Sequence, residues 1–230
     1  MRTTELDPVA GYDAWAQRYD EPGNPIIALE RSAVWSMLEP LPPGRALDAA
    51  CGTGRHAQRL CELGHDVVGV DTSPEMLARA AANAPSAAFI RADLREVPAA
   101  DARFDLVICG LALSHLDDIA PALRELARVL RPGGRMVISV LHPFLALLGW
   151  QAPFTDREGA RGFIREHPHR HARWIACFRD AGLELLDCRE PELDAAALRS
   201  KRRAFARIPE ATIEAYAGLP AVLVWELRRR

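Results

Sequence analysis

Lysine is almost absent from this sequence. Lys201 is the only lysine among 29 lysine and arginine residues. This scarcity excludes two common classes of nucleotide-dependent enzyme. A P-loop needs a lysine directly after a glycine to hold phosphates, and a short-chain dehydrogenase needs a Tyr-x-x-x-Lys pair; the sequence has neither pattern.

Cysteine pairs and long apolar runs are also missing. The five cysteines are odd in number and form no Cys-x-x-Cys pair, which predicts free thiols in a reducing compartment and neither a disulfide framework nor a zinc site. No apolar run approaches the roughly 20 residues that span a bilayer, and the N-terminal region has no signal-peptide core. We therefore expect a cytoplasmic protein with no membrane partner.

Charge and length narrow the possibilities further. The net charge of −2 and the pI near 6.4 give no electrostatic footprint for nucleic acid, so no nucleic-acid partner is expected. A chain of 230 residues is long enough for one large domain, or for one domain with additions.

The most informative segment is a glycine turn between an apolar run and a helical pattern. The run over 45–50 is followed by Gly52 and Gly54, and a helix-like segment covers 55–63. Glycine allows backbone dihedrals that a β-carbon forbids, and it lets a ligand lie against bare backbone. A second apolar run ends at Asp71, whose carboxylate is placed to accept hydrogen bonds from a ribose. Strand, glycine turn, helix, strand and acid together predict a site for a nucleoside-containing cofactor.

Strand-like and helical patterns alternate along the rest of the chain. Two helices separated by a break at 21–25 come first. After the first two strands, further strands are predicted at 88–91, 104–109, 136–141, 183–188 and 221–227. Helices are predicted between them, the clearest after Asp71 and at 171–181. Such alternation with short links predicts an α/β fold with a doubly wound, mostly parallel sheet.

The identity of the cofactor depends on Asp48. Gly52-x-Gly54-x-x-Ala57 also fits the fingerprint of dinucleotide-binding proteins. A carboxylate just before the glycines would repel a pyrophosphate, whereas it suits a cationic ligand such as a sulfonium or an α-amino group.

Five segments in register resemble the motifs of the class I S-adenosylmethionine-dependent methyltransferases of the small-molecule type. They are LDAACGTG (47–54), VDTSPEML (70–77), ADL (92–94), FDLV (104–107) and LRPGGR (130–135). Ala50 departs from the pattern, because the family usually has glycine there. The resemblance implies a seven-stranded Rossmann-like sheet with strand order 3-2-1-4-5-7-6, its seventh strand antiparallel, and S-adenosylmethionine as cofactor.

The same resemblance implies a set of cofactor-binding residues. Asp48 and the backbone of Ala50, Gly52 and Gly54 would hold the methionine portion, and Cys109 would offer its carbonyl to the α-amino group. Asp71, with Thr72 beside it, would bind the ribose. The adenine would contact Met76, Asp93 and Leu94.

The N-terminal segment YDAWAQRYD (12–20) is similar to one that folds over the site in small-molecule methyltransferases. Tyr12, Trp15 and Tyr19 fall on one helical face, and Tyr19 would contact the cofactor. Residues 1–40 are therefore predicted as a helical lid, and 41–230 as the cofactor-binding domain. An alternative is an amphipathic helix that simply packs on the sheet.

Two histidines are candidates for a general base. His115 follows the fourth strand and His142 ends the fifth, so both lie at the edge where ligands bind in such sheets. A base with a pKa near neutrality assists transfer to a hydroxyl or amine. A helix-capping or packing role is the alternative for each.

An irregular segment at about 142–170 is predicted as a substrate lid. It contains Phe144, Trp150, Phe154 and Phe163, which suit a flat or apolar acceptor, although a small satellite core would look the same. His167, His169 and His171 alternate at its end, but no cysteine or carboxylate pattern completes a metal site, so none is predicted.

The sequence therefore predicts methyl transfer to a small-molecule acceptor by in-line displacement at the sulfonium methyl. Neither the acceptor nor the oligomeric state is specified. An N-P-P-Y-like motif for nucleic-acid amines is absent, because CGLA (109–112) stands in its place. Two alternatives stay open: an NAD(P)-dependent oxidoreductase of Rossmann type, and a protein that binds S-adenosylmethionine without transferring its methyl group.

Overall fold

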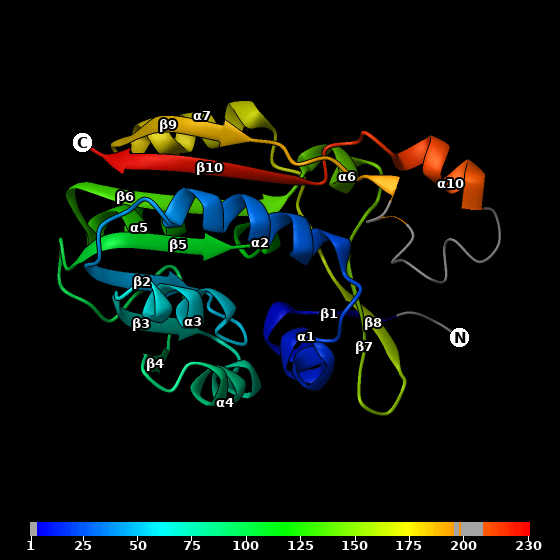
Figure 1. The fold of residues 1–230 in the computed structure, drawn as a ribbon, viewed down its shortest axis with the longest axis horizontal. Helices are drawn as coiled ribbons and strands as arrows, with labels where there is room; N and C mark the ends of the chain where they lie inside the picture. Colours follow the sequence, from blue (N-terminus) through cyan, green and yellow to red (C-terminus); the bar gives the residue numbers. More distant parts are fainter. Residues whose placement is uncertain (1–3, 196–197, 199–208) are drawn as a thin grey trace.

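The computed structural model describes residues 4–195, 198 and 209–230, so Lys201 lies outside the described residues. Its main element is a seven-stranded sheet (Figure 1). In spatial order the strands are β4 (Ala88–Arg91), β3 (Asp66–Asp71), β2 (Arg45–Ala49), β5 (Phe104–Gly110), β6 (Leu130–Leu141), β10 (Val222–Arg229) and β9 (Leu183–Arg189). From β4 to β6 all neighbours pair in parallel, whereas β10 runs antiparallel to both β6 and β9. When the strands of this sheet are numbered along the chain, their spatial order is 3-2-1-4-5-7-6, which is the predicted order.

Both faces of the sheet are buried, and most residues of its central strands are apolar. In β5, Leu106 and Ile108 face one core cluster, while Val107 and Cys109 face the other. Strands covered on both sides are expected to lack polar alternation. Helices α2 (Pro25–Leu38) and α3 (Arg55–Glu62) cover the first face, α5 (Ala120–Val129) and α7 (His171–Asp180) cover the second, and α4 (Pro74–Asn83) packs beside β3 and β4.

Helix α2 belongs to the core of the domain. Asn24 caps it by accepting a hydrogen bond from the Ile26 N–H at 3.1 Å, and Pro25 occupies the first turn, where a missing N–H costs nothing. Its Val34 and Leu38 are fully buried against the sheet. The predicted break at 21–25 is thus confirmed, and only the residues before α2 remain as a candidate lid.

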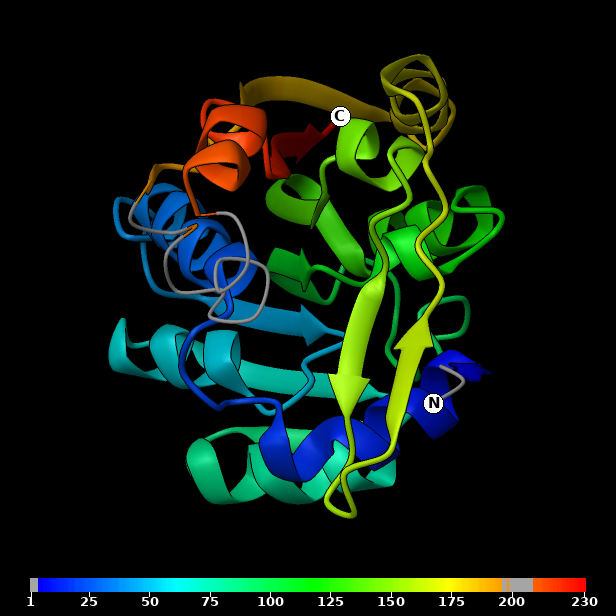
Figure 2. The same ribbon diagram turned by 90° about the vertical axis from the view of Figure 1, so that its right-hand side faces the viewer.

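A second, three-stranded sheet lies at the carboxyl ends of the parallel strands. Figure 2 shows its two antiparallel strands beside the N-terminal helix. The elements at this end are β1 (Thr4–Leu6), α1 (Pro8–Trp15), the 3-10 helix η1 (Ala16–Arg18), α6 (Pro143–Leu147), β7 (Ala152–Thr155), β8 (Arg161–Ile164) and α10 (Pro209–Tyr216).

The prediction of an irregular segment at about 142–170 was therefore wrong in part. Strands β7 and β8 form an antiparallel hairpin, and β1 adds to β8 in parallel. The hairpin turn is stabilised by Asp156, which accepts hydrogen bonds from the N–H groups of Glu158 and Ala160. Strands of three and four residues leave no readable alternation in the sequence, and β1 lies more than 150 residues from its partner β8.

The glycine turn makes a stability prediction. Gly54 has φ of +81°, and a β-carbon there would lie 3.0 Å from the Cα of Ala80 in α4. Gly54→Ala is expected to lower the free energy of unfolding by about 2–4 kcal/mol, the sum of left-handed strain and overpacking. Gly52→Ala is the control, because Gly52 has φ of +53° but a β-carbon there would contact none of the described residues beyond its chain neighbours within 4 Å. It should cost only about 1–2 kcal/mol. Equal losses in urea titrations would contradict the packing argument.

Candidate active site

The turn after β2 presents bare backbone to the space above the sheet. A β-carbon placed on Gly52 would meet no heavy atom of the described residues within 4 Å, its two chain neighbours aside. Ala50 also has a left-handed backbone, with φ of +57°, so the residue that departs from the family pattern occupies a conformation that glycine adopts more easily. The turn thus has the open cradle that a cofactor needs.

Asp48 lies under this turn with its side chain fully buried. Its Oδ2 accepts a hydrogen bond from the Ala57 N–H at 2.8 Å, while its Oδ1 has no partner among the described residues. Burial raises the pKa of Asp48 to about 6. A buried carboxylate oxygen with spare accepting capacity fits the cationic end of S-adenosylmethionine.

Cofactor affinity should therefore depend on pH through Asp48. A cationic ligand favours the ionised carboxylate, so binding below pH 6 must release a proton. The Kd of S-adenosylhomocysteine, measured by calorimetry, is expected to weaken by about tenfold from pH 7.5 to pH 5. Asp48→Asn should bind more weakly at pH 7.5 and lose this dependence. A profile that stays as steep in the variant would assign the titration to another group.

Asp71 lies at the carboxyl end of β3 and is held by the neighbouring turns. Its Oδ2 accepts from the Gly52 N–H at 2.8 Å, and its Oδ1 accepts from the Ser73 N–H at 2.9 Å. Burial raises its pKa, against the lowering effect of these backbone hydrogen bonds. Each oxygen retains a lone pair, so the carboxylate can also accept from a ribose diol. Thr72, beside it, is half-buried.

The remaining predicted cofactor residues lie along the same edge in different environments. Met76 is 1% exposed in α4. Asp93 pairs with Arg95 at 2.6 Å, which lowers its pKa. Leu94 is half-buried against a core cluster, and the Cys109 thiol is fully buried in β5, which raises its pKa. Their contacts with a cofactor stay predictions.

The N-terminal aromatic residues form one cluster, as their helical spacing predicts. Ring centroids of Tyr12 and Trp15 lie 6.1 Å apart, and those of Trp15 and Tyr19 lie 4.9 Å apart. Trp15 also stacks on Phe154 of β7 at 6.1 Å. The N-terminal segment and the hairpin therefore form a single cover.

Two carboxylates fasten this cover to the cofactor-side turns. Asp13 accepts a hydrogen bond from the Ser73 hydroxyl at 2.5 Å, and Asp20 accepts from the Thr53 hydroxyl at 2.8 Å. The hydroxyls belong to the loops that follow β3 and β2. The segment thus closes directly over the predicted cofactor site, which favours the lid interpretation.

A cavity of about 310 Å³ lies beneath the cover. Most of its lining is apolar or aromatic, with one buried carboxyl group. The lining includes Tyr12, Tyr19, Ile26, Leu141, Trp150 and Glu166. Of the aromatic residues predicted for the substrate lid, Trp150 lines the cavity and Phe154 supports its cover. Phe144 is not among the residues that line this cavity, and 44% of its surface is exposed.

His115 lies next to this cavity in the 3-10 helix η2 (Leu113–His115). Its Nδ1 donates to the carbonyl oxygen of Arg165 at 2.8 Å, since a carbonyl can only accept. When the ring is neutral, its lone pair is therefore on Nε2, and this atom lies 2.7 Å from the Tyr12 hydroxyl. Tyr12 is itself a cavity residue, so the hydroxyl connects His115 to the cavity.

Glu166 completes this group and was not identified from the sequence. Its Oε1 lies 3.8 Å from His115 Nε2, and its buried Oε2 has no partner among the described residues. Burial raises the pKa of Glu166, although His115 opposes the shift. In the sequence, Glu166 lies in a segment predicted to be irregular, and glutamate is common in such segments, so no signal singled it out.

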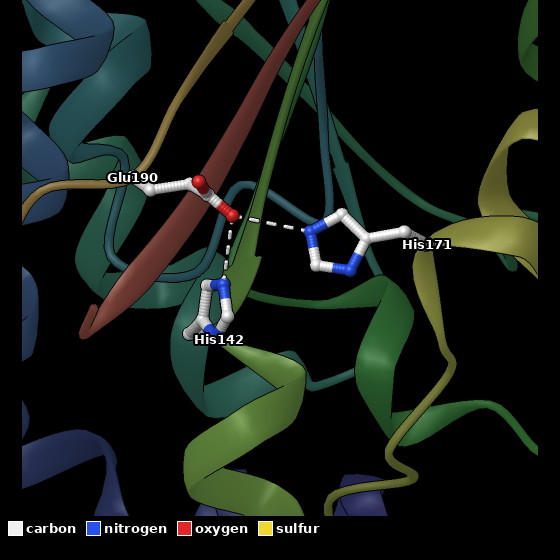
Figure 3. A group of neighbouring side chains, drawn as sticks. All are labelled: His142, His171 and Glu190. Carbon is white, nitrogen blue, oxygen red and sulfur yellow. Dashed lines mark hydrogen bonds and ion pairs between the residues drawn. The ribbon is translucent and has the colours of Figure 1, made fainter. Parts of the chain in front are cut away.

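His142 lies in a different environment, shown in Figure 3. Its Nε2 and that of His171 lie 3.0 Å and 3.1 Å from the same oxygen of Glu190. These three ligand atoms are within 4.8 Å of one another, so they could hold a metal ion. The Nδ1 of His142, however, accepts from the Phe144 N–H at 3.2 Å, which places the ring proton on Nε2. A metal would need the opposite tautomer, so the geometry favours a hydrogen-bonded clamp that joins β6, α7 and β9.

The alternating histidines at 167–171 do not converge. His167 and His169 stack with centroids 6.1 Å apart, and His169 Nε2 donates to the carbonyl of Leu116 at 2.7 Å. His171 turns away to Glu190. In the sequence, the alternate spacing of these histidines suggested one face of an extended segment. In the structure, α7 begins at His171 and separates it from His167 and His169.

The fold and this edge define an α/β domain that binds a nucleoside cofactor, and comparisons with known proteins give the family. Residues 47–138 match the methyltransferase domain family. A demethylmenaquinone methyltransferase from Beutenbergia cavernae is 37% identical over 159 residues, which are 64% of this chain and 66% of that protein. A malonyl-[acyl-carrier protein] O-methyltransferase from Erwinia pyrifoliae is 40% identical over 121 residues, or 51% and 46% of the two chains.

A solved structure has the same architecture over nearly its whole length. The S-adenosylmethionine-dependent methyltransferase from Mesorhizobium loti is 27% identical with a TM-score of 0.67, and the alignment covers 87% of this chain and 98% of that one. The chain belongs to the class I S-adenosylmethionine-dependent methyltransferases. It spans between about half and two thirds of the two sequence relatives named above. Within the described part of the chain, no helix is both long and apolar enough to cross a bilayer.

Proposed function

We propose that this protein transfers the methyl group of S-adenosylmethionine to a small, largely apolar acceptor bound in the cavity beneath the N-terminal cover. The contact that carries this proposal is the 2.7 Å hydrogen bond between the Tyr12 hydroxyl and His115 Nε2. It links a cavity-lining group to a buried base whose tautomer is fixed by the Arg165 carbonyl.

The chain has to position the acceptor and remove its proton. The bound cofactor supplies an activated methyl group on a positively charged sulfur, so catalysis is mostly in-line positioning. The Tyr12 oxygen would accept the proton of an acceptor hydroxyl or amine, while its own proton passes to His115 Nε2. Burial raises the pKa of Tyr12 well above its ordinary value, so the phenol stays neutral and acts as a relay. The imidazolium formed at His115 would be stabilised by Glu166.

The cavity supports a restricted class of acceptor. Its volume of about 310 Å³ is at the lower end of the range for small-molecule sites. The lining is mostly apolar, and a single buried carboxyl, Glu166, can orient one polar group. By their names, the two sequence relatives act on demethylmenaquinone and on malonyl-[acyl-carrier protein]. The products of the assay below distinguish methylation of oxygen, nitrogen and carbon.

The decisive experiment is a screen of small phenols, carboxylic acids, amines and enolisable carbonyl compounds with isotopically labelled S-adenosylmethionine. We expect label to appear in an acceptor, and Tyr12→Phe to lower the rate while S-adenosylhomocysteine binding, measured by calorimetry, is retained. Tight binding of S-adenosylhomocysteine with no labelled product from any class would favour the non-transferring alternative. Binding of NAD but not of S-adenosylhomocysteine would favour the oxidoreductase.

A further inference from the structure

A buried ion pair lies behind the glycine turn and has no part in the proton relay. Glu30 of α2 is fully buried. Its Oε2 accepts from Arg55 Nη1 at 2.6 Å, and its Oε1 accepts from His56 Nε2 at 3.0 Å and from the Ser139 hydroxyl at 2.7 Å. Burial alone would raise the pKa of a carboxyl, but His56, Arg55 and Ser139 outweigh it and lower the pKa of Glu30 to about 2. The carboxylate is therefore ionised in the folded protein.

This ion pair lies where the methionine portion of the cofactor is expected. A β-carbon on Gly110, the last residue of β5, would lie 3.0 Å from Glu30 Oε1. Arg55 is the first residue of α3, directly after Gly54, and its charge is close enough to Tyr19 and Asp48 to be influenced by both. The guanidinium thus stands between the ends of β2 and β5, at the point where the strand order reverses and ligands bind in such sheets.

Arg55 retains hydrogen-bonding capacity after pairing with Glu30. Its buried Nε has no partner among the described residues, and 17% of its side-chain surface is accessible. A guanidinium fork matches a carboxylate or a phosphate in a bidentate pair. S-adenosylmethionine carries one carboxylate, on the amino-acid portion that would face two acids, Asp48 and Glu30. These two acids would repel the cofactor's carboxylate, so a cation is needed at this place to offset the repulsion.

We propose that Arg55 binds the carboxylate of the cofactor's amino-acid portion, and that Glu30 positions the Arg55 guanidinium for it. This inference rests on the cofactor half of the proposed function and is independent of the acceptor.

Glu30 was not identified from the sequence, although a glutamate on the apolar face of the helix at 25–38 was a visible signal. A buried charge without a partner is costly, so its partner had to be close to the sheet.

The test compares two ligands that differ only in the carboxylate: S-adenosylhomocysteine and its decarboxylated analogue, S-adenosyl-3-thiopropylamine. Their Kd values are measured by calorimetry at pH 7.5. Arg55→Gln should weaken S-adenosylhomocysteine by about 10- to 100-fold, the range for a hydrogen bond between charged groups. The analogue should change by less than about threefold in the same variant. Arg135→Gln is the matched control, because Arg135 also pairs with a glutamate, Glu226 at 2.7 Å, but near the amino end of the sheet.

Arg55→Gln leaves the buried Glu30 carboxylate without its ion-pair partner, and this could unfold the protein. The double variant Glu30→Gln/Arg55→Gln removes both charges and so controls for this effect. It should fold, as judged by its thermal transition, and bind both ligands with similar affinity. Equal weakening of both ligands in both variants would overturn the proposal and leave Arg55 a structural role. A wild-type protein that binds neither ligand would instead contradict the proposed cofactor, so the two failures are distinguishable.

Discussion

Replacing His115 by glutamine is expected to lower kcat by about 100- to 1,000-fold, the contribution typical of a positioned general base. The amide can still hydrogen-bond to Tyr12, but it cannot take up the proton that the relay delivers. The affinity for S-adenosylhomocysteine should change little, because His115 contacts the cover and the cavity group and not the glycine turn. Single-turnover rates with labelled cofactor, combined with calorimetry, measure the two effects separately.

His169→Gln serves as the control for this experiment. His169 also uses a ring nitrogen to bind a backbone carbonyl, that of Leu116 at 2.7 Å, but it makes no contact with Tyr12 among the described residues. Its turnover should stay within about threefold of the wild type, since surface and loop changes away from a site have small effects. If His115→Gln retained full turnover, His115 would be removed from the mechanism and a packing role would stand.

Asp71→Asn is expected to weaken S-adenosylhomocysteine binding by about 30- to 100-fold, because two charge-assisted hydrogen bonds to the ribose become neutral ones. The change also removes one of the two oxygens that accept from Gly52 and Ser73, so the glycine turn loses part of its support. Calorimetric titration measures the effect directly.

The matched control is Asp66→Asn, since Asp66 is an exposed aspartate at the other end of the same strand, β3. Its binding constant should equal that of the wild type. An Asp71→Asn variant with unchanged affinity would mean that the ribose is held elsewhere, and the predicted cofactor pose would then be wrong even though the family assignment is not.

The parallel sheet was predictable because each of its units is local. An apolar run, a glycine turn and a helical pattern follow one another within about 25 residues, and buried strands carry apolar residues on both faces. The turn from Asp48 to Gly54 and the acid at Asp71 were readable for the same reason. The resemblance to the family added the strand order, including the antiparallel β10, which the spacing alone did not contain.

The cover was only partly predictable. The aromatic spacing at Tyr12, Trp15 and Tyr19 predicted one cluster, and the ring distances agree. The hairpin of β7 and β8 was missed, because strands of four residues lack a periodic signal and the turn at Asp156 was not recognised as one. Helix α2 was assigned to the lid, whereas Val34 and Leu38 place it in the core.

The sequence by itself determined the α/β class, the glycine turn and the acids at Asp48 and Asp71, because these depend on residues close together in the chain. Only the tertiary structure decided which distant side chains meet. Tyr12 and His115 are 103 residues apart in the sequence, and Glu30 is 109 residues from Ser139. His142 and Glu190 are joined across β6, β10 and β9. Such contacts arise from the order of strands and the packing of layers, and no local pattern encodes them.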